Sequence, residues 1–143
     1  MTLLIRVLLT IAAIQYGVIP PIVDFTDTHV FNDSWPPHAR FHMVWLVVTA
    51  SLAALSVVLA CWVPAKDILF RLRFACVPGW LVLGGFFGSA FLLSRYQGSL
   101  TDMAEPIVVL GVDGNVFSFS VAATFQLIAT ILIFRSARPE ATS

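Results

Sequence analysis

The sequence predicts an all-α membrane protein, a bundle of four transmembrane helices forming a single domain of residues 1–143. Two features of composition support this class. Hydrophobic residues make up 59% of the chain and charged residues only 11%, whereas soluble domains carry about 25% charged residues. Mean hydropathy is +0.92. A soluble core of this size could not bury so much apolar surface, so we expect the lipid bilayer to be the principal partner.

The apolar residues gather in stretches of about 20, the length that crosses the hydrocarbon core. We expect helices at residues 3–23, 41–63, 74–93 and 116–134. Pro20 and Pro21 should break or kink the end of the first helix. This helix is interpreted as retained rather than as a signal peptide, since no cleavage site precedes a soluble domain. The polar tail, residues 136–143, is predicted to be flexible.

The connections differ in length. Residues 64–73 form a short link, which predicts an antiparallel hairpin of the second and third helices. Longer connections span residues 24–40 and 95–115. In the second of these, an apolar run precedes Asp113-Gly114, a turn signal that predicts a small β-hairpin.

Basic residues orient the bundle, because they are enriched in cytoplasmic loops. Only Arg40 and Arg95 fall on one side; the other side carries Arg6, Lys66, Arg71, Arg73, Arg135 and Arg138. We therefore expect a multi-pass integral membrane protein with its N-terminus and C-terminus inside; if the cell is bacterial, the membrane would be the cytoplasmic or inner one. Most acidic residues fall on the outer side, which agrees with this orientation.

Composition and cysteine placement give no support to nucleic-acid binding or to a disulfide or zinc site built on cysteine. The formal net charge is zero, so there is no basic surface for nucleic acid. Cys61 and Cys76 lie in apolar runs and are interpreted as small hydrophobic residues. The Gly84-x-x-x-Gly88 spacing indicates close helix packing, either within the chain or between two copies in a homo-oligomer.

One segment carries all three histidines: His29, His38 and His42 lie within residues 28–42. Three acids lie in or just before this segment, namely Asp24, Asp27 and Asp33. On a helix, His38 and His42 share a face that Trp45 continues. Burying an ionisable side chain at a membrane boundary is costly unless it has a partner, so such residues often mark a functional site. These residues are therefore candidates for a pocket at the outer end of the bundle.

Two chemistries fit this set. Histidine with carboxylate suits acid–base catalysis, with His38 and His42 as the pair and His29, Asp24, Asp27 or Asp33 supporting them. Three histidines (His29, His38 and His42) also suit Zn, Fe or Cu, although their spacing matches no standard zinc signature and no cofactor is required. The alternative is structural, because histidines and aromatic residues at a membrane interface also anchor helix ends.

Further polar and aromatic residues complete the predicted site. Asn32, Trp35 and Trp45 would shape the pocket, and Glu105 could meet the histidines across its mouth. Gln15 and Gln126 lie within predicted helices, where they would floor a cavity below the histidines. The competing interpretation of both glutamines is hydrogen bonding between helices.

Residues 28–42 resemble the signature T-H-x-F-N-x-x-W-P-P-H-A-x-F-H of a family of small bacterial and fungal membrane proteins of unknown function. The layout is also similar, more loosely, to DoxX-like proteins and to the sterol-isomerase and sigma-2-receptor superfamily, some of which hold a hydrophobic ligand among buried acids. This chain departs from that pattern because its ionisable residues cluster in a loop. The resemblance therefore implies an architecture and not an activity.

Two functions follow as hypotheses. The first is a membrane-embedded protein that binds a hydrophobic small molecule, or acts on it as an isomerase, cyclase, hydratase or other lyase. Proton transfer or a metal would supply the chemistry. The second is a non-enzymatic accessory subunit or scaffold of a membrane complex.

Overall fold

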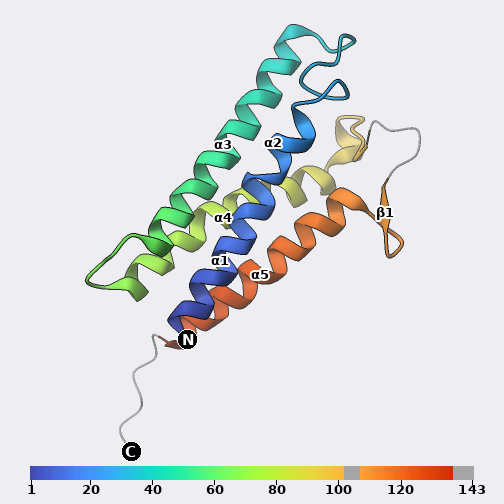
Figure 1. Ribbon diagram of the computed structural model, residues 1–143. Helices are drawn as coiled ribbons and strands as arrows, with labels where there is room; N and C mark the ends of the chain where they lie inside the picture. Colours follow the sequence, from blue (N-terminus) through green and yellow to red (C-terminus); the bar gives the residue numbers. More distant parts are fainter. Residues whose placement is uncertain (102–106, 137–143) are drawn as a thin grey trace, which may run out of the picture.

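The computed structural model describes residues 1–101 and 107–136, and its architecture is the predicted all-α bundle (Figure 1). In this part of the chain, four helical spans are long and apolar enough to cross a membrane. They are α1 (Thr2–Gly17) continued by α2 (Ile19–Asp24), then α3 (Pro37–Trp62), α4 (Ile68–Phe91) and α5 (Gly114–Ser136). These spans fit a multi-pass integral membrane protein. The predicted flexible tail at 137–143 lies outside the described residues.

Helix α1 is the centre of the packing. It contacts α3 on one side and α5 on the other, and α4 completes the bundle by packing against both of these helices. Its buried face includes Ile5, Leu9 and Tyr16. Where α1 meets α3, a Cβ atom at Gly17 would overlap the side chain of Ala54, so only glycine allows this close approach.

Two prolines break the first span as predicted. Pro20 and Pro21 have no N–H group, so the helical hydrogen bonds that they would make are missing and the chain bends at Val18, between α1 and α2. The hydrogen bond missing at Pro21 frees the carbonyl of Gly17. The hydroxyl of Ser51 on α3 donates to this carbonyl at 2.8 Å, which satisfies the freed acceptor from a neighbouring helix.

Two helices begin earlier than hydropathy predicts. Helix α3 starts at Pro37 rather than residue 41, and α4 starts at Ile68 rather than residue 74. The carboxylate of Asp67 caps α4 by accepting from the Phe70 amide at 2.9 Å. At 1.5 Å per residue, α3 is about 39 Å long against about 30 Å of hydrocarbon, so a helix end can lie outside the apolar stretch.

The predicted β-hairpin is present, but its turn is not at Asp113-Gly114. Strands β1 (Val108–Val109) and β2 (Val112–Asp113) pair antiparallel. The turn is Leu110-Gly111, both with positive φ (52° and 80°), the conformation of a two-residue hairpin turn. The carboxylate of Asp113 instead accepts from the amide of Asn115 at 2.9 Å, so this residue caps the start of α5.

Candidate functional site

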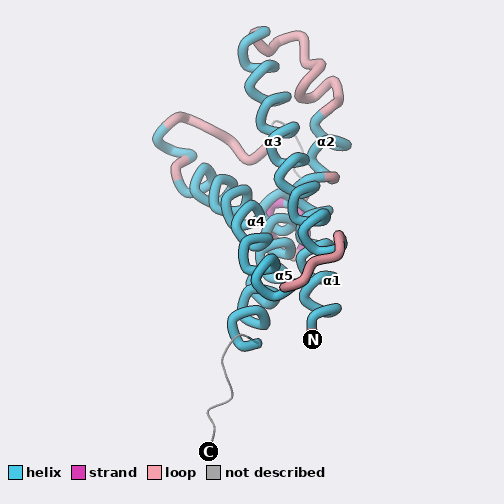
Figure 2. The backbone as a smooth tube through the Cα atoms, turned by 90° about the vertical axis from the view of Figure 1, so that its left-hand side faces the viewer, coloured by secondary structure: helices cyan, strands magenta, loops and turns pink. Residues whose placement is uncertain are grey.

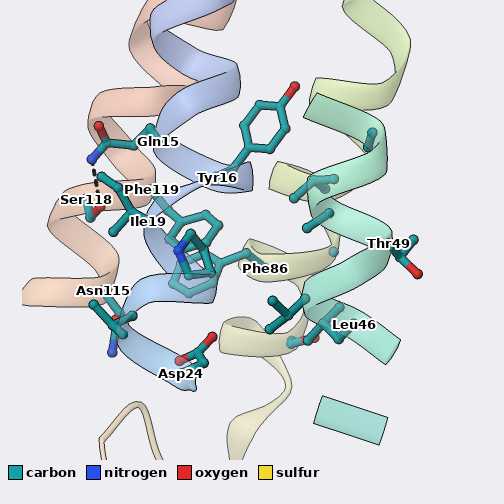
Figure 3. Close-up of a pocket in the computed structure, with 18 of the residues that line it drawn as sticks. Gln15, Tyr16, Ile19, Asp24, Leu46, Thr49, Phe86, Asn115, Ser118 and Phe119 are labelled. Carbon is teal, nitrogen blue, oxygen red and sulfur yellow. Dashed lines mark hydrogen bonds between the residues drawn. The ribbon is translucent and has the colours of Figure 1, made fainter. Parts of the chain in front are cut away.

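A cavity of about 620 Å³ opens among all four spans (Figure 3). This volume lies within the range of small-molecule sites, roughly 300–1,000 Å³. Most of its lining is apolar. The polar members are Gln15, Tyr16, Asp24, Thr49, Ser89, Asn115 and Ser118. An apolar cavity with a few polar groups is the usual form of a site for a hydrophobic ligand.

Prolines lie on two sides of this cavity. Pro20 lines it from the first span, and Pro78 lines it from the middle of α4. A proline inside a helix removes one backbone hydrogen bond and clashes with the preceding turn, which bends the helix. The helices therefore depart from continuous helical hydrogen bonding where they border the cavity.

Asp24 and Asn115 lie at one end of the cavity (Figure 3). The side chain of Asp24 is only 15% exposed, and its Oδ1 lies 4.0 Å from Nε2 of His29, an ion-pair distance. The other ring nitrogen of His29, Nδ1, is 2.8 Å from the hydroxyl of Thr28. Contacts on both nitrogens fix the orientation of the imidazole, and the Asp24 carboxylate connects it to the cavity.

The hydroxyl contacts continue from His29 back to the end of α2. Oγ1 of Thr28 lies 3.0 Å from Oγ1 of Thr26, and Thr26 in turn donates to the carbonyl of Val23 at 3.0 Å. The resulting chain runs from the exposed loop through His29 to Asp24. The last link, from Nε2 of His29 to Oδ1 of Asp24, is 4.0 Å long, so it is an electrostatic contact rather than a hydrogen bond.

Gln15 and Tyr16 lie toward the opposite end of the cavity from Asp24, and Phe86 and Phe119 lie between the two ends (Figure 3). Gln15 donates from Nε2 to the hydroxyl of Ser118 at 2.7 Å, which links α1 to α5. The rings of Phe86 and Phe119 stack at 4.0 Å between centroids, nearly parallel. These contacts hold the wall of the cavity in place.

Tyr16 is fully buried, and its ring extends from α1 toward α3 (Figure 3). Among the described residues, no partner lies within hydrogen-bonding distance of its hydroxyl. An unpaired buried hydroxyl is costly in hydrocarbon. The hydroxyl points away from the other labelled lining residues (Figure 3), so it is an unpaired buried group of the core and Tyr16 borders the cavity with its ring.

The cavity is open on the side between α3 and α4. These helices diverge from the short connection between them, as both Figure 1 and Figure 2 show. Leu46 on α3 and Leu81 on α4 both line the cavity, yet they are 64% and 72% exposed. Both residues lie within helices that are long and apolar enough to span a membrane.

The predicted acid–base pair lies elsewhere. His38 and His42 contact each other, with their Nε2 atoms 3.0 Å apart, on an exposed face at the start of α3. Neither lines the cavity. Trp45 continues this face, as the helical spacing predicts, and its ring centroid lies 5.9 Å from that of His42. It borders a separate shallow hollow of about 360 Å³ with Phe41, Val44 and Val48.

The remaining residues of the predicted outer site make contacts within the loop. Asn32 donates to the carbonyl of Thr28 at 3.1 Å and accepts from the amide and hydroxyl of Ser34 at 3.0 and 2.7 Å. Trp35 packs edge-on against His29, with ring centroids 5.8 Å apart. Asp33 lies 3.6 Å from Arg40. These contacts order the loop.

Of the other residues predicted for the site, some line the cavity and some do not. Asp27 is exposed and does not line the cavity. Gln126 is fully buried beside Gly79 in the core, also outside the cavity, whereas Gln15 lines it as predicted. Glu105 lies outside the described residues. Within residues 1–101 and 107–136, no three or more His, Cys, Asp or Glu side chains come together in a way that could hold a metal ion.

Sequence reasoning did not select Tyr16, Asn115, Ser118 or Phe86. Tyr16 and Ser118 carry a usable signal, because each is a polar group inside an otherwise apolar span. Phe86 carries none, since it is one of twelve phenylalanines and only the packing distinguishes it.

Residues 8–77 of the chain match a family of unknown function, DUF6640. The match runs from α1 into α4 and includes Asp24, His29, His38 and His42. No curated protein and no solved structure matches the chain. The chain is thus similar, over just under half of its length, to a family for which no activity is known.

Proposed function

We propose that this protein takes a hydrophobic small molecule from the bilayer into the cavity between its helices and holds the polar end of that molecule at Asp24. One observation carries the proposal. Among the described residues that line this largely apolar cavity, Asp24 is the one charged side chain, and it lies near one end. Apolar walls favour burial of a hydrocarbon body, and a carboxylate favours a hydrogen-bond donor or a cation.

The opening between α3 and α4 supports the proposal that the ligand enters from the bilayer. Leu46 and Leu81 line the cavity and are also exposed on a membrane-spanning surface. A lipid-like molecule can therefore pass from the bilayer into the cavity without crossing water, where exposing its apolar surface would cost about 25 cal/mol per Å².

The same geometry supports acid–base chemistry on the ligand. The Asp24 carboxylate would accept a proton from the bound molecule or return one to it, with the His29 imidazole 4.0 Å away as the neighbouring base. An isomerisation, a cyclisation or a hydration needs only such transfers. This proposal assigns the chemistry to Asp24 and His29, because His38 and His42 do not line the cavity.

Two adjacent glycines provide a matched test. Gly85 lines the cavity and Gly84 does not, yet a Cβ atom at either position would meet no heavy atom within 4 Å. The Gly85→Phe variant should fill the cavity, whereas Gly84→Phe should leave it open. Each variant and the wild type would be purified in native lipid, and their hydrophobic molecules extracted and identified by mass spectrometry.

The proposal expects one class of molecule at near-stoichiometric amount in the wild type and in Gly84→Phe, and its loss in Gly85→Phe. If all three proteins carry only bulk lipids in membrane proportions, the cavity is not a ligand site.

The proposed orientation places Asp24 and the outer loop on the non-cytoplasmic side. The distribution of basic residues supports it. Arg6 on α1 lies over Trp62 at the end of α3, with 6.0 Å from its guanidinium carbon to the ring centroid, so Arg6 is at the same end of the bundle as the α3–α4 connection (Figure 1). Both termini would then be cytoplasmic.

A second candidate is a subunit of a larger assembly. Gly84 and Gly88 have open space beside them, so the small-residue spacing of α4 is not used for packing within the described chain. A second copy or another membrane helix would fit there. Gly88→Leu should then dissociate the assembly in detergent, as measured by light scattering after size exclusion; an unchanged mass would contradict this candidate.

A further inference from the structure

The histidine pair at the start of α3 is separate from the cavity. His38 and His42 are one helical turn apart, and both side chains are exposed. Their Nε2 atoms lie 3.0 Å apart and their ring centroids 4.4 Å apart. Two imidazole nitrogens therefore converge on one point at the outer end of the bundle.

We propose that His38 and His42 form a two-histidine site for a divalent transition-metal ion, bound through both Nε2 atoms. With metal–nitrogen bonds of about 2.05 Å, nitrogens at this separation subtend roughly 94° at the metal. Neighbouring ligands in a square-planar or octahedral complex lie near 90°, whereas a tetrahedral site would need nitrogens about 3.3 Å apart. This angle suits Cu²⁺ or Ni²⁺, and Cu²⁺ binds most tightly in the divalent series.

Metal binding requires a lone pair on each Nε2. In the hydrogen bond between the rings, one Nε2 carries the hydrogen and the other accepts it. When the metal binds, the donating ring moves that hydrogen from Nε2 to Nδ1, which leaves both rings neutral and both Nε2 atoms free. The site needs no rearrangement of the backbone, because the two residues are fixed by α3.

Aromatic neighbours hold the imidazoles in place. Phe41 stacks against His38, with ring centroids 6.4 Å apart and planes 15° apart. Trp45 packs against His42 from the next turn. Arg40, between the histidines in sequence, is paired with Asp33 instead. The pair is exposed and no third metal-ligating side chain joins it among the described residues, so water or an external ligand would complete the coordination.

The third histidine supplies a matched control. His29 contacts Asp24 and Thr28 and does not take part in the pair. The experiment adds Cu²⁺ alone to the purified full-length protein and records its electron paramagnetic resonance spectrum. The variants are His38→Ala, His42→Ala, the double variant and His29→Ala, with circular dichroism to confirm that each is folded.

The wild type and His29→Ala should bind one Cu²⁺ with two equatorial imidazole nitrogens. Each single variant should show one imidazole nitrogen and weaker binding, and the double variant should show only the spectrum of Cu²⁺ without these imidazole ligands. The proposal is wrong if the folded wild type binds no Cu²⁺, if the double variant keeps the wild-type spectrum, or if only His29→Ala changes it. Because the pair does not line the cavity, these outcomes are independent of ligand binding there.

Discussion

Gln126 on α5 donates a hydrogen bond from its Nε2 to the backbone carbonyl of Cys76 on α4, at 2.8 Å, and Gln126 is fully buried. This contact is possible because Gly79, one turn further along α4, has no side chain. A Cβ atom there would lie 2.7 Å from Nε2 of Gln126. The two helices are therefore joined by a side-chain-to-backbone hydrogen bond beside a glycine.

This relationship predicts that Gly79→Ala destabilises the bundle. The added methyl would displace Gln126 or separate α4 from α5, and overpacking of this kind costs about 1–3 kcal/mol. Gly84→Ala is the control, because its Cβ would meet open space and the helix gains roughly 0.5–1 kcal/mol from losing a glycine. Thermal unfolding in one detergent should rank Gly79→Ala below the wild type and Gly84→Ala at or above it. Equal effects of the two variants would contradict the account of the α4–α5 contact.

The Asp24 carboxylate is predicted to hold the polar end of the ligand. Asp24→Asn keeps the size of the side chain and removes its charge. Because hydrogen bonds to charged groups contribute roughly 1.5–3 kcal/mol, retention of the native ligand should weaken by about tenfold or more. Asp27→Asn, at an exposed acid outside the cavity, should retain the wild-type amount. Mass spectrometry of the extracted ligand makes the comparison; equal retention in both variants would remove Asp24 from the site.

Asn32 is predicted to order the outer loop rather than to touch the ligand. Its side chain bonds both Thr28 and Ser34, so Asn32→Ala removes three hydrogen bonds at once. Hydrogen exchange at the amides of residues 28–35 should become faster, while exchange in α4 and α5 stays unchanged. If the loop exchanges at the wild-type rate in Asn32→Ala, its order comes from other contacts.

The distribution of charge predicts that both ends of the chain are cytoplasmic. A reporter that is active only in the cytoplasm should work when fused after Ser143 and should fail when inserted in the outer loop at Asp33. Replacing Arg71 and Arg73 with Gln should weaken this preference, because both contribute to the basic excess near the α3–α4 connection. Activity of the reporter only in the outer-loop insertion would reverse the orientation and put Asp24 on the inner side.

The sequence was sufficient to predict the helical spans, because apolar stretches of this length have one stable arrangement in lipid. Hydropathy alone placed the starts of α3 and α4 too late. Hydropathy detects the hydrocarbon boundary, whereas Asp67 and Pro37 set the helix ends beyond it. The contact between His38 and His42 follows from helical spacing, so it was within reach of sequence reasoning.

The cavity was not within reach of sequence reasoning. The cavity depends on how far α3 and α4 diverge and on which side chains from separate helices line the space between them. Neither property leaves a periodic pattern in the sequence. The pairing of Asp24 with His29 depends on a loop that folds back, in which the amide of Val30 bonds the carbonyl of Asp24 at 3.0 Å. This loop separates His29 from the other two histidines, which helical spacing alone could not indicate.

The most direct test of ligand binding uses a lipid-like probe with a photoactivatable diazirine in its acyl chain. The protein would be irradiated with this probe in membranes, and the labelled residues mapped by peptide mass spectrometry. The account predicts labels on cavity residues such as Val82 and Phe86, retained in Gly84→Phe and lost in Gly85→Phe. Labels confined to outward-facing residues such as Leu52 and Leu55, and equal in both variants, would contradict it.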